Sequence, residues 1–162
     1  KGYKGYFQCD GFEGYESAFK TRPDVLIVNC MAHIRRHFEQ AQKENKEMAA
    51  YALKEIQLLY RVEHECDERE LITEQRKETR LKKSKPVMDN LKLWMETEGI
   101  KHSSNSLIGK AVTYAYTRWD NMMRYLMDGR IRIDNNLAEN AIRPITLGRT
   151  ICSVAIMKLL SV

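Results

Sequence analysis

The chain has 162 residues, 43% of them hydrophobic and 30% charged, a composition typical of a globular protein and not of a disordered one. It has no apolar run near the roughly 18 residues of a membrane span and no signal-peptide layout at its N-terminus, which argues against a membrane protein. The net charge of +5 indicates a mild preference for polyanions. The four cysteines lack the spacing of a disulfide framework, which predicts a reducing, cytoplasmic environment.

The first forty residues predict a fragment of a sheet. Residues 3–9 partly alternate aromatic and polar side chains and predict a strand, residues 13–19 a short helix, and the apolar, β-branched residues 24–29 a buried strand. Asp10 then stands at the C-terminal end of the first strand, where ligands of open α/β sheets gather. An Asp10-Gly11 pair is equally typical of an ordinary turn, so this position alone does not identify a site.

Residues 31–129 are predicted to be helical. The mostly charged residues 66–83 predict a long exposed helix, Pro86 lies in the first turn of a new helix, and residues 106–127 predict a last long helix ended by Gly129. Residues 76–85 contain six Lys or Arg against one Glu. Such a run forms a solvated helix face about as often as it contacts DNA.

Cys30 and His33 form a Cys-x-x-His pair directly after the second predicted strand. One such pair is half of a zinc site, and no second pair follows at ligand spacing. The sequence therefore favours a packing role for the cysteine at the strand end over a structural zinc.

The most informative stretch begins at Asp134-Asn135-Asn136, three residues that favour helix N-caps. Apolar residues then recur at helical spacing as far as a proline at position 144. Glu139 and Arg143, four residues apart, share a face of this short helix. The helix thus displays groups that can hold a metal ion and a phosphate together, although Asn136 and Glu139 also match a capping box.

This run, DNNLAENAIRP followed by Gly148-Arg149, resembles the C-terminal catalytic block of the insertion-sequence-66 family of bacterial transposases. Two further blocks agree in order, QCDGFEGY at residues 8–15 and CMAHIRRHF at residues 30–38. The similarity covers residues 6–149, and three ordered blocks are far more specific than any single motif.

The resemblance implies a fold that is α/β in origin but mostly α here. A partial ribonuclease-H-like core of two strands would occupy residues 1–40, a large all-helical insertion residues 41–130, and the helix of the catalytic Glu residues 131–149. By the same resemblance, Asp10 and Glu139 are the second and third acids of an Asp-Asp-Glu triad. They would bind Mg²⁺ or Mn²⁺, with their carboxylates roughly 4–7 Å apart.

The resemblance also implies DNA as the partner, both the ends of the insertion sequence and the target, together with self-association or other transposase subunits, in the bacterial cytoplasm. Cys30 and His33 would be structural. The residues expected to contact DNA are Arg35, Arg36, Asn135, Asn136, Arg143 and Arg149.

Two departures from the family pattern lead us to expect that this chain alone is an inactive fragment. The residue matching the first Asp of the triad would lie upstream of Lys1. After Arg149 the family continues differently, and every overlapping codon pair in residues 150–162 permits the family residue in a shifted frame. We therefore expect these last residues to be an out-of-frame tail.

Two alternatives to a transposase fragment stay open. One is a non-catalytic remnant that binds DNA or a sister transposase through the same residues. The other is a helical interaction module, which the composition permits but which leaves the block at residues 134–144 unexplained.

Overall fold

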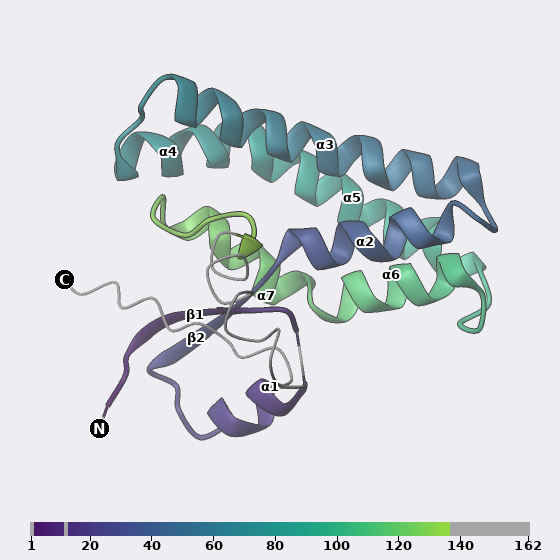
Figure 1. Ribbon diagram of the computed structural model, residues 1–162, viewed down its shortest axis with the longest axis horizontal. Coiled ribbons are helices and arrows are strands. Elements are labelled where there is room, and N and C mark those ends of the chain that lie inside the picture. Colours follow the sequence, from purple (N-terminus) through teal and green to yellow (C-terminus); the bar gives the residue numbers. More distant parts are fainter. Residues whose placement is uncertain (1, 12, 137–162) are drawn as a thin grey trace, which may run out of the picture.

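The computed structural model describes residues 2–11 and 13–136, and every structural statement below concerns that part of the chain. Two strands, β1 (Gly5–Cys9) and β2 (Val25–Asn29), lie beside a set of helices (Figure 1). The α-helices are α1 (Glu13–Phe19), α2 (Met31–Ala41), α3 (Lys46–Glu68), α4 (Thr73–Thr79), α5 (Lys85–Thr97), α6 (Leu107–Thr117) and α7 (Trp119–Met123). A π-helical turn spans Arg80–Ser84, and 3₁₀ turns span Gly99–Lys101 and Arg124–Met127. The expected class, mostly helical with two strands of sheet, is confirmed, and the two strands are parallel.

The sheet is a strand–helix–strand unit in which β1 and β2 run parallel, with Gly5 opposite Val25 and Cys9 opposite Asn29. Parallel strands need a crossover, which α1 provides. The Phe7 ring packs against Tyr15 and Phe19, at centroid distances of 5.2 and 4.9 Å. α1 therefore covers one face of the sheet, and in Figure 1 it lies on the side away from the helices of the bundle.

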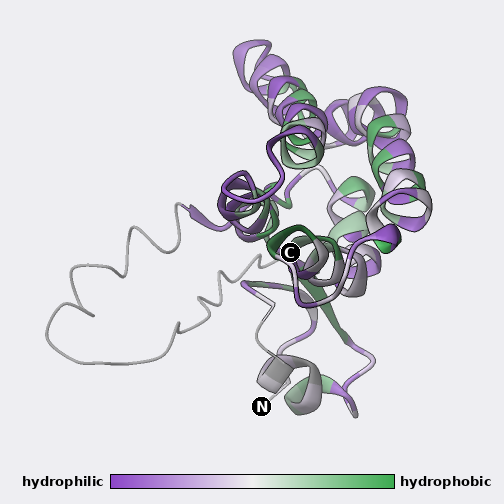
Figure 2. Cartoon of the chain, turned by 90° about the vertical axis from the view of Figure 1, so that its right-hand side faces the viewer, coloured by the Kyte–Doolittle hydropathy of each residue, from purple (hydrophilic) through white to green (hydrophobic). Residues whose placement is uncertain are grey.

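The other helices enclose a separate, larger core. α2 packs between α3 and α6, and α3 packs along α5. Figure 2 shows the hydrophobic faces of these helices turned inward and their hydrophilic faces turned outward. The largest fully buried apolar side chains of this core are Met31, Ile34, Phe38, Ile56, Leu59, Met88, Leu91, Met95, Ile108, Trp119 and Tyr125. No helix among the described residues combines the length and apolarity needed to cross a bilayer.

The expected long exposed helix over residues 66–83 is wrong. α3 ends at Glu68, and Glu70 turns the chain with a φ of 48°, so that α4, the π-helical turn and α5 return along α3. The physical reason is a buried ion pair: Arg80 donates to the Glu63 carboxylate from Nε at 2.8 Å and from Nη2 at 2.6 Å. The charged stretch at residues 66–83, which the sequence predicts to be solvated, therefore contains a residue of the protein core.

The expected single helix over residues 106–127 is also wrong, because the chain breaks at Arg118. This residue has φ −106° and ψ 0°, outside the helical region, and it separates α6 from α7. The break lets Trp119 enter the core while the Arg118 side chain reaches the turn after β1. No local signal such as Gly or Pro marks it in the sequence.

After α7 the chain returns to the sheet through residues 128–133. The Gln8 side chain donates to the Arg132 carbonyl at 2.8 Å, and the Met31 N–H donates to the Ile133 carbonyl at 3.0 Å. Ile133 itself is buried. These contacts place Asp134 near the C-terminal end of β2, where α2 also starts.

Candidate functional site

Asp10 lies immediately beyond the C-terminal end of β1, as the sequence predicts. Its backbone carbonyl accepts a hydrogen bond from the Tyr114 hydroxyl of α6 at 2.6 Å. Beside it, Asn29 ends β2 and is 1% exposed, and its Nδ2 lies 3.9 Å from the Cys9 sulfur. The strand end that carries Asp10 is therefore held both by the neighbouring strand and by a helix from far along the chain.

Gly11, the next residue, is fixed by Arg118. The Gly11 carbonyl accepts from Arg118 Nε at 3.2 Å and from Nη2 at 2.9 Å. Its φ of +85° lies in the region that favours glycine, and a Cβ at this position would stand 2.5 Å from Arg118 Nε. The turn after Asp10 thus requires glycine for two independent reasons.

Three side chains stack next to this turn. The His37 and Tyr114 rings lie 3.9 Å apart with 28° between their planes, and the Arg118 guanidinium carbon lies 4.1 Å from the Tyr114 centroid. Burial raises the pKa of Tyr114, so its hydroxyl stays a donor. Burial also lowers the pKa of His37, and the nearby charges of Arg118, His33 and Arg36 lower it further. The stack therefore sits in a positive field.

The Asp-Asn-Asn start of the C-terminal block forms a side-chain-capped turn. The Asp134 carboxylate accepts from the Asn136 backbone N–H at 3.1 Å, from the Asn136 side-chain amide at 3.1 Å and from the Tyr60 hydroxyl at 3.0 Å. Such Asx turns start helices. Burial, with the neighbouring Asp134 charge, raises the pKa of Tyr60. Asp134 is thus engaged in positioning the block.

Cys30 ties this block to the start of α2. Its sulfur accepts from the Asn135 N–H at 3.4 Å, and burial raises the pKa of its thiol to about 11. His33 follows in the first turn of α2. Across residues 2–11 and 13–136, no three His, Cys, Asp or Glu side chains gather at metal-ligand spacing.

Of the six residues predicted to contact DNA, four lie in the described part of the chain and two lie outside it. Arg35 is paired with Glu39 at 3.0 Å while still about half exposed, and Arg36 is exposed. Asn135 is partly buried and Asn136 is exposed. Glu139, Arg143 and Arg149 lie outside the described residues, as does the expected tail at residues 150–162. Their roles, and the expected Asp10–Glu139 distance, stay predictions.

The basic run at residues 76–85 is mostly committed to ion pairs within the fold. Arg76 pairs with Glu63 and Asp67, Arg80 with Glu63, Lys83 with Glu65 and Lys85 with Asp89. Arg80 is 0% exposed, so this residue of the run is neither on a solvated helix face nor accessible to DNA.

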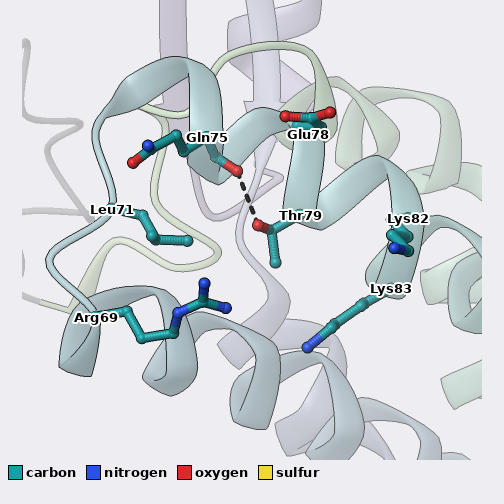
Figure 3. A pocket seen from close by; sticks show the side chains of 7 residues that line it. All are labelled: Arg69, Leu71, Gln75, Glu78, Thr79, Lys82 and Lys83. Atoms are coloured by element: carbon teal, nitrogen blue, oxygen red, sulfur yellow. Dashed lines mark hydrogen bonds between the residues drawn. The ribbon is translucent and has the colours of Figure 1, made fainter.

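A shallow groove of about 300 Å³ does lie beside the run (Figure 3). Arg69, Lys82 and Lys83 line it together with Glu78, and both Arg69 and Lys83 contact Glu65. Carboxylates therefore balance much of the positive charge of this groove.

Sequence reasoning missed the residues that surround Asp10. Tyr114 and Arg118, four residues apart, resemble any pair on the surface of a helix, and His37 resembles a core or surface histidine. Only the tertiary packing of α6 against α2 reveals their contact with Asp10 and Gly11. The one signal available was the position of His37 inside the block at residues 30–38.

Comparison with known proteins identifies the family of this chain. The family model described as Transposase IS66 family matches residues 1–157. Two similar proteins come from Sinorhizobium fredii (strain NBRC 101917 / NGR234): the uncharacterized protein y4qI is 34% identical over 156 residues and the uncharacterized protein y4hP 32% identical over 165 residues. Each alignment covers 91% of this chain.

The chain spans only 28% and 29% of the length of these two relatives. No solved structure matches it significantly. The resemblance inferred from the three sequence blocks is thus confirmed at the level of the family.

Proposed function

The chain belongs to the IS66 family of transposases, and we propose that it supplies the second and third acids, Asp10 and Glu139, of a metal-dependent centre for DNA strand cleavage and strand transfer. The observation that supports the proposal is that Asp10 directly follows β1, while the Asp134–Asn136 turn contacts Cys30, which directly follows the neighbouring strand β2. Cys9 pairs with Asn29 at the ends of the strands, and the Ile133 carbonyl accepts from the Met31 N–H just beyond. The block that carries Glu139 therefore starts at the end of the strand that pairs with the strand of Asp10.

The donor atoms at these strand ends fit a hard divalent cation. The side-chain oxygens of Asn29 and Asn135 are buried and have no hydrogen-bond partner within the described part of the chain. Mg²⁺ and Mn²⁺ prefer oxygen ligands from carboxylates, amides and phosphates. Asp10 and Glu139 would hold the ion, which when bound supplies activation of the attacking oxygen and stabilisation of the leaving oxygen.

The chain's own residues would receive and orient the DNA backbone. Arg36 and Arg118 carry positive charge near His37, on the side of the Asp10 turn where α2 packs against α6. A phosphodiester held there would face Asp10. Arg35, Asn136, Arg143 and Arg149 are further proposed DNA contacts, and Cys30 with His33 supports the start of α2.

We further propose that β1 and β2 belong to a ribonuclease-H-like sheet. The parallel pair with its helical crossover and the acid at a strand end support this, as does the small size of the sheet, because two strands alone rarely form a stable unit. Other segments of the intact protein would supply the remaining strands and the first acid.

The proposal is tested with the intact transposase that carries this chain. In an assay of strand cleavage at insertion-sequence ends with Mn²⁺, Asp10→Asn and Glu139→Gln should each lower the rate at least about a hundredfold, since each removes charge from the site that stabilises the transition state. Asp89→Asn is the matched control and should leave the rate unchanged, because its carboxylate is about half exposed and pairs with Lys85 within α5. Retained activity in Asp10→Asn would exclude Asp10 from the triad.

A second candidate function, DNA binding without catalysis, rests on the exposed arginines Arg35 and Arg36 of α2. It predicts salt-dependent DNA binding that Asp10→Asn leaves intact or strengthens, with no metal-dependent cleavage by the intact protein. The two functions therefore differ in the cleavage assay and agree in the binding assay.

A further inference from the structure

The helical part of the chain reaches directly into the turn that carries Asp10. Tyr114 and Arg118 lie one helical turn apart at the end of α6 and donate to two consecutive carbonyls, those of Asp10 and Gly11. The first contact spans 104 residues of sequence and the second 107. Two adjacent peptide groups are thus fixed by one distant element.

The two donors are themselves held in place. The Tyr114 ring lies between the His37 ring at 3.9 Å and the Arg118 guanidinium at 4.1 Å. Arg118 also donates from Nη1 to the Thr117 hydroxyl at 3.0 Å and lies 3.4 Å from the Tyr114 carbonyl. Neither donor can change rotamer without losing several of these contacts.

The backbone on both sides of the contact is unusual. Gly11 has a φ of +85° with no room for a Cβ beside Arg118, and Arg118 leaves the helical region at the break between α6 and α7. Glycine adopts this φ at little cost, so residue 11 lets the chain turn close to Arg118. The contacts between these two residues join α6 to the Asp10 turn.

We propose that Tyr114 and Arg118 are positioning residues that set the direction of the Asp10 carboxylate by fixing the peptide groups on its C-terminal side. The inference rests on the proposed role of Asp10 as a metal ligand. One methylene group joins the Asp10 carboxylate to the backbone, so the orientation of the carboxylate depends on how firmly that backbone is held. A misplacement of about 1 Å is costly at such a site. The helical segment is therefore part of the metal site.

The test uses the chain as it stands and Mn²⁺ as the probe. Paramagnetic broadening of the Gly11 amide resonance during an Mn²⁺ titration reports binding next to Asp10. Tyr114→Phe keeps the stacked ring and removes the hydroxyl, and Arg118→Lys keeps the charge and removes the fork of donors. Each is expected to weaken Mn²⁺ binding about fivefold, the effect of one lost hydrogen bond.

Matched controls separate positioning from stability. Tyr116→Phe makes the same change on the same helix, where the hydroxyl contacts Glu96 at 3.1 Å, and Arg124→Lys alters an arginine that donates to the Ile27 carbonyl of β2 at 2.7 Å. Both controls should leave the Mn²⁺ affinity unchanged, whatever they do to the melting temperature. A structural role alone would change melting temperatures in all four variants and affinity in none.

The outcomes distinguish this inference from the proposed function. If Asp10→Asn abolishes the broadening while Tyr114→Phe and Arg118→Lys bind Mn²⁺ as tightly as the unmodified chain, the positioning role is overturned and the role of Asp10 stands. If the unmodified chain shows no broadening at Gly11, or Asp10→Asn leaves it unchanged, the proposed metal ligand is wrong and the inference falls with it.

Discussion

At the scale of single residues, two constraints act on Gly11: its backbone conformation and the lack of space for a Cβ. Gly5 offers a matched comparison, because its φ of +119° is also in the glycine region while the nearest side-chain atom to a Cβ there, in Tyr3, is 3.9 Å away. Gly5→Ala therefore tests the backbone constraint by itself. Gly11→Ala adds the collision with Arg118.

We expect Gly5→Ala to lower the free energy of unfolding by about 1 kcal/mol and Gly11→Ala by about 2–3 kcal/mol, because only the second variant must also displace Arg118. Urea unfolding followed by circular dichroism measures both. Equal losses in the two variants would mean that Arg118 moves aside freely, which is incompatible with a tightly held Asp10 turn.

At the scale of secondary-structure elements, the Glu63–Arg80 pair holds the α3–α4 hairpin and the turn before the C-terminal block. Besides Glu63, Arg80 donates to the carbonyls of Tyr125 and Asp128, at 2.9 and 3.0 Å. The π-helical turn begins at Arg80, where the helix widens by one residue. A single buried guanidinium thus joins three segments.

Arg80→Met should lower the free energy of unfolding by about 3–5 kcal/mol, because it removes both Arg80 hydrogen bonds to the buried Glu63 carboxylate and leaves that carboxylate with Arg76 alone. Lys85→Met is the matched control from the same basic run: its pair with Asp89 is about half exposed, and its loss should cost less than about 1 kcal/mol. The measurement is chemical denaturation of both variants. Similar losses in the two would show that Arg80 does not hold the hairpin.

The elements that the sequence predicts well are those whose signal is local. β2 is apolar and β-branched, Asp10-Gly11 ends β1, and Ser106 caps α6 by accepting from the Gly109 N–H at 3.0 Å. The hairpin after α3 and the break at Arg118 are missed, because both depend on contacts with distant residues. A charged side chain reads as exposed unless its buried partner is known, and the partner of Arg80 lies 17 residues away.

At the scale of the whole molecule, the sequence predicts correctly that Asp10 lies at a strand end, and the expected approach of Glu139 to Asp10 stays a prediction. The sequence does not predict what surrounds that strand end. The positive field arises because packing of α2 against α6 brings Arg118 close to His37, and Arg36 lies on the same helix as His37. No sequence motif links Arg118 to α2. Long-range packing of this kind leaves no periodicity in a single sequence.

This field leads to a prediction about DNA binding by the described fold. Affinity for duplex DNA should fall steeply between 50 and 200 mM salt with little sequence preference, since phosphate contacts release counterions without reading bases. Arg36→Gln should weaken binding and reduce the slope of log affinity against log salt by about 0.9, the contribution of one phosphate contact.

Lys82→Gln, in the groove of Figure 3, is the matched control and should leave the slope nearly unchanged. Fluorescence anisotropy with a labelled duplex measures all three proteins. A larger effect from Lys82 than from Arg36 would move the DNA to the α4 side of the molecule, away from Asp10, and binding that ignores salt would favour a helical interaction module.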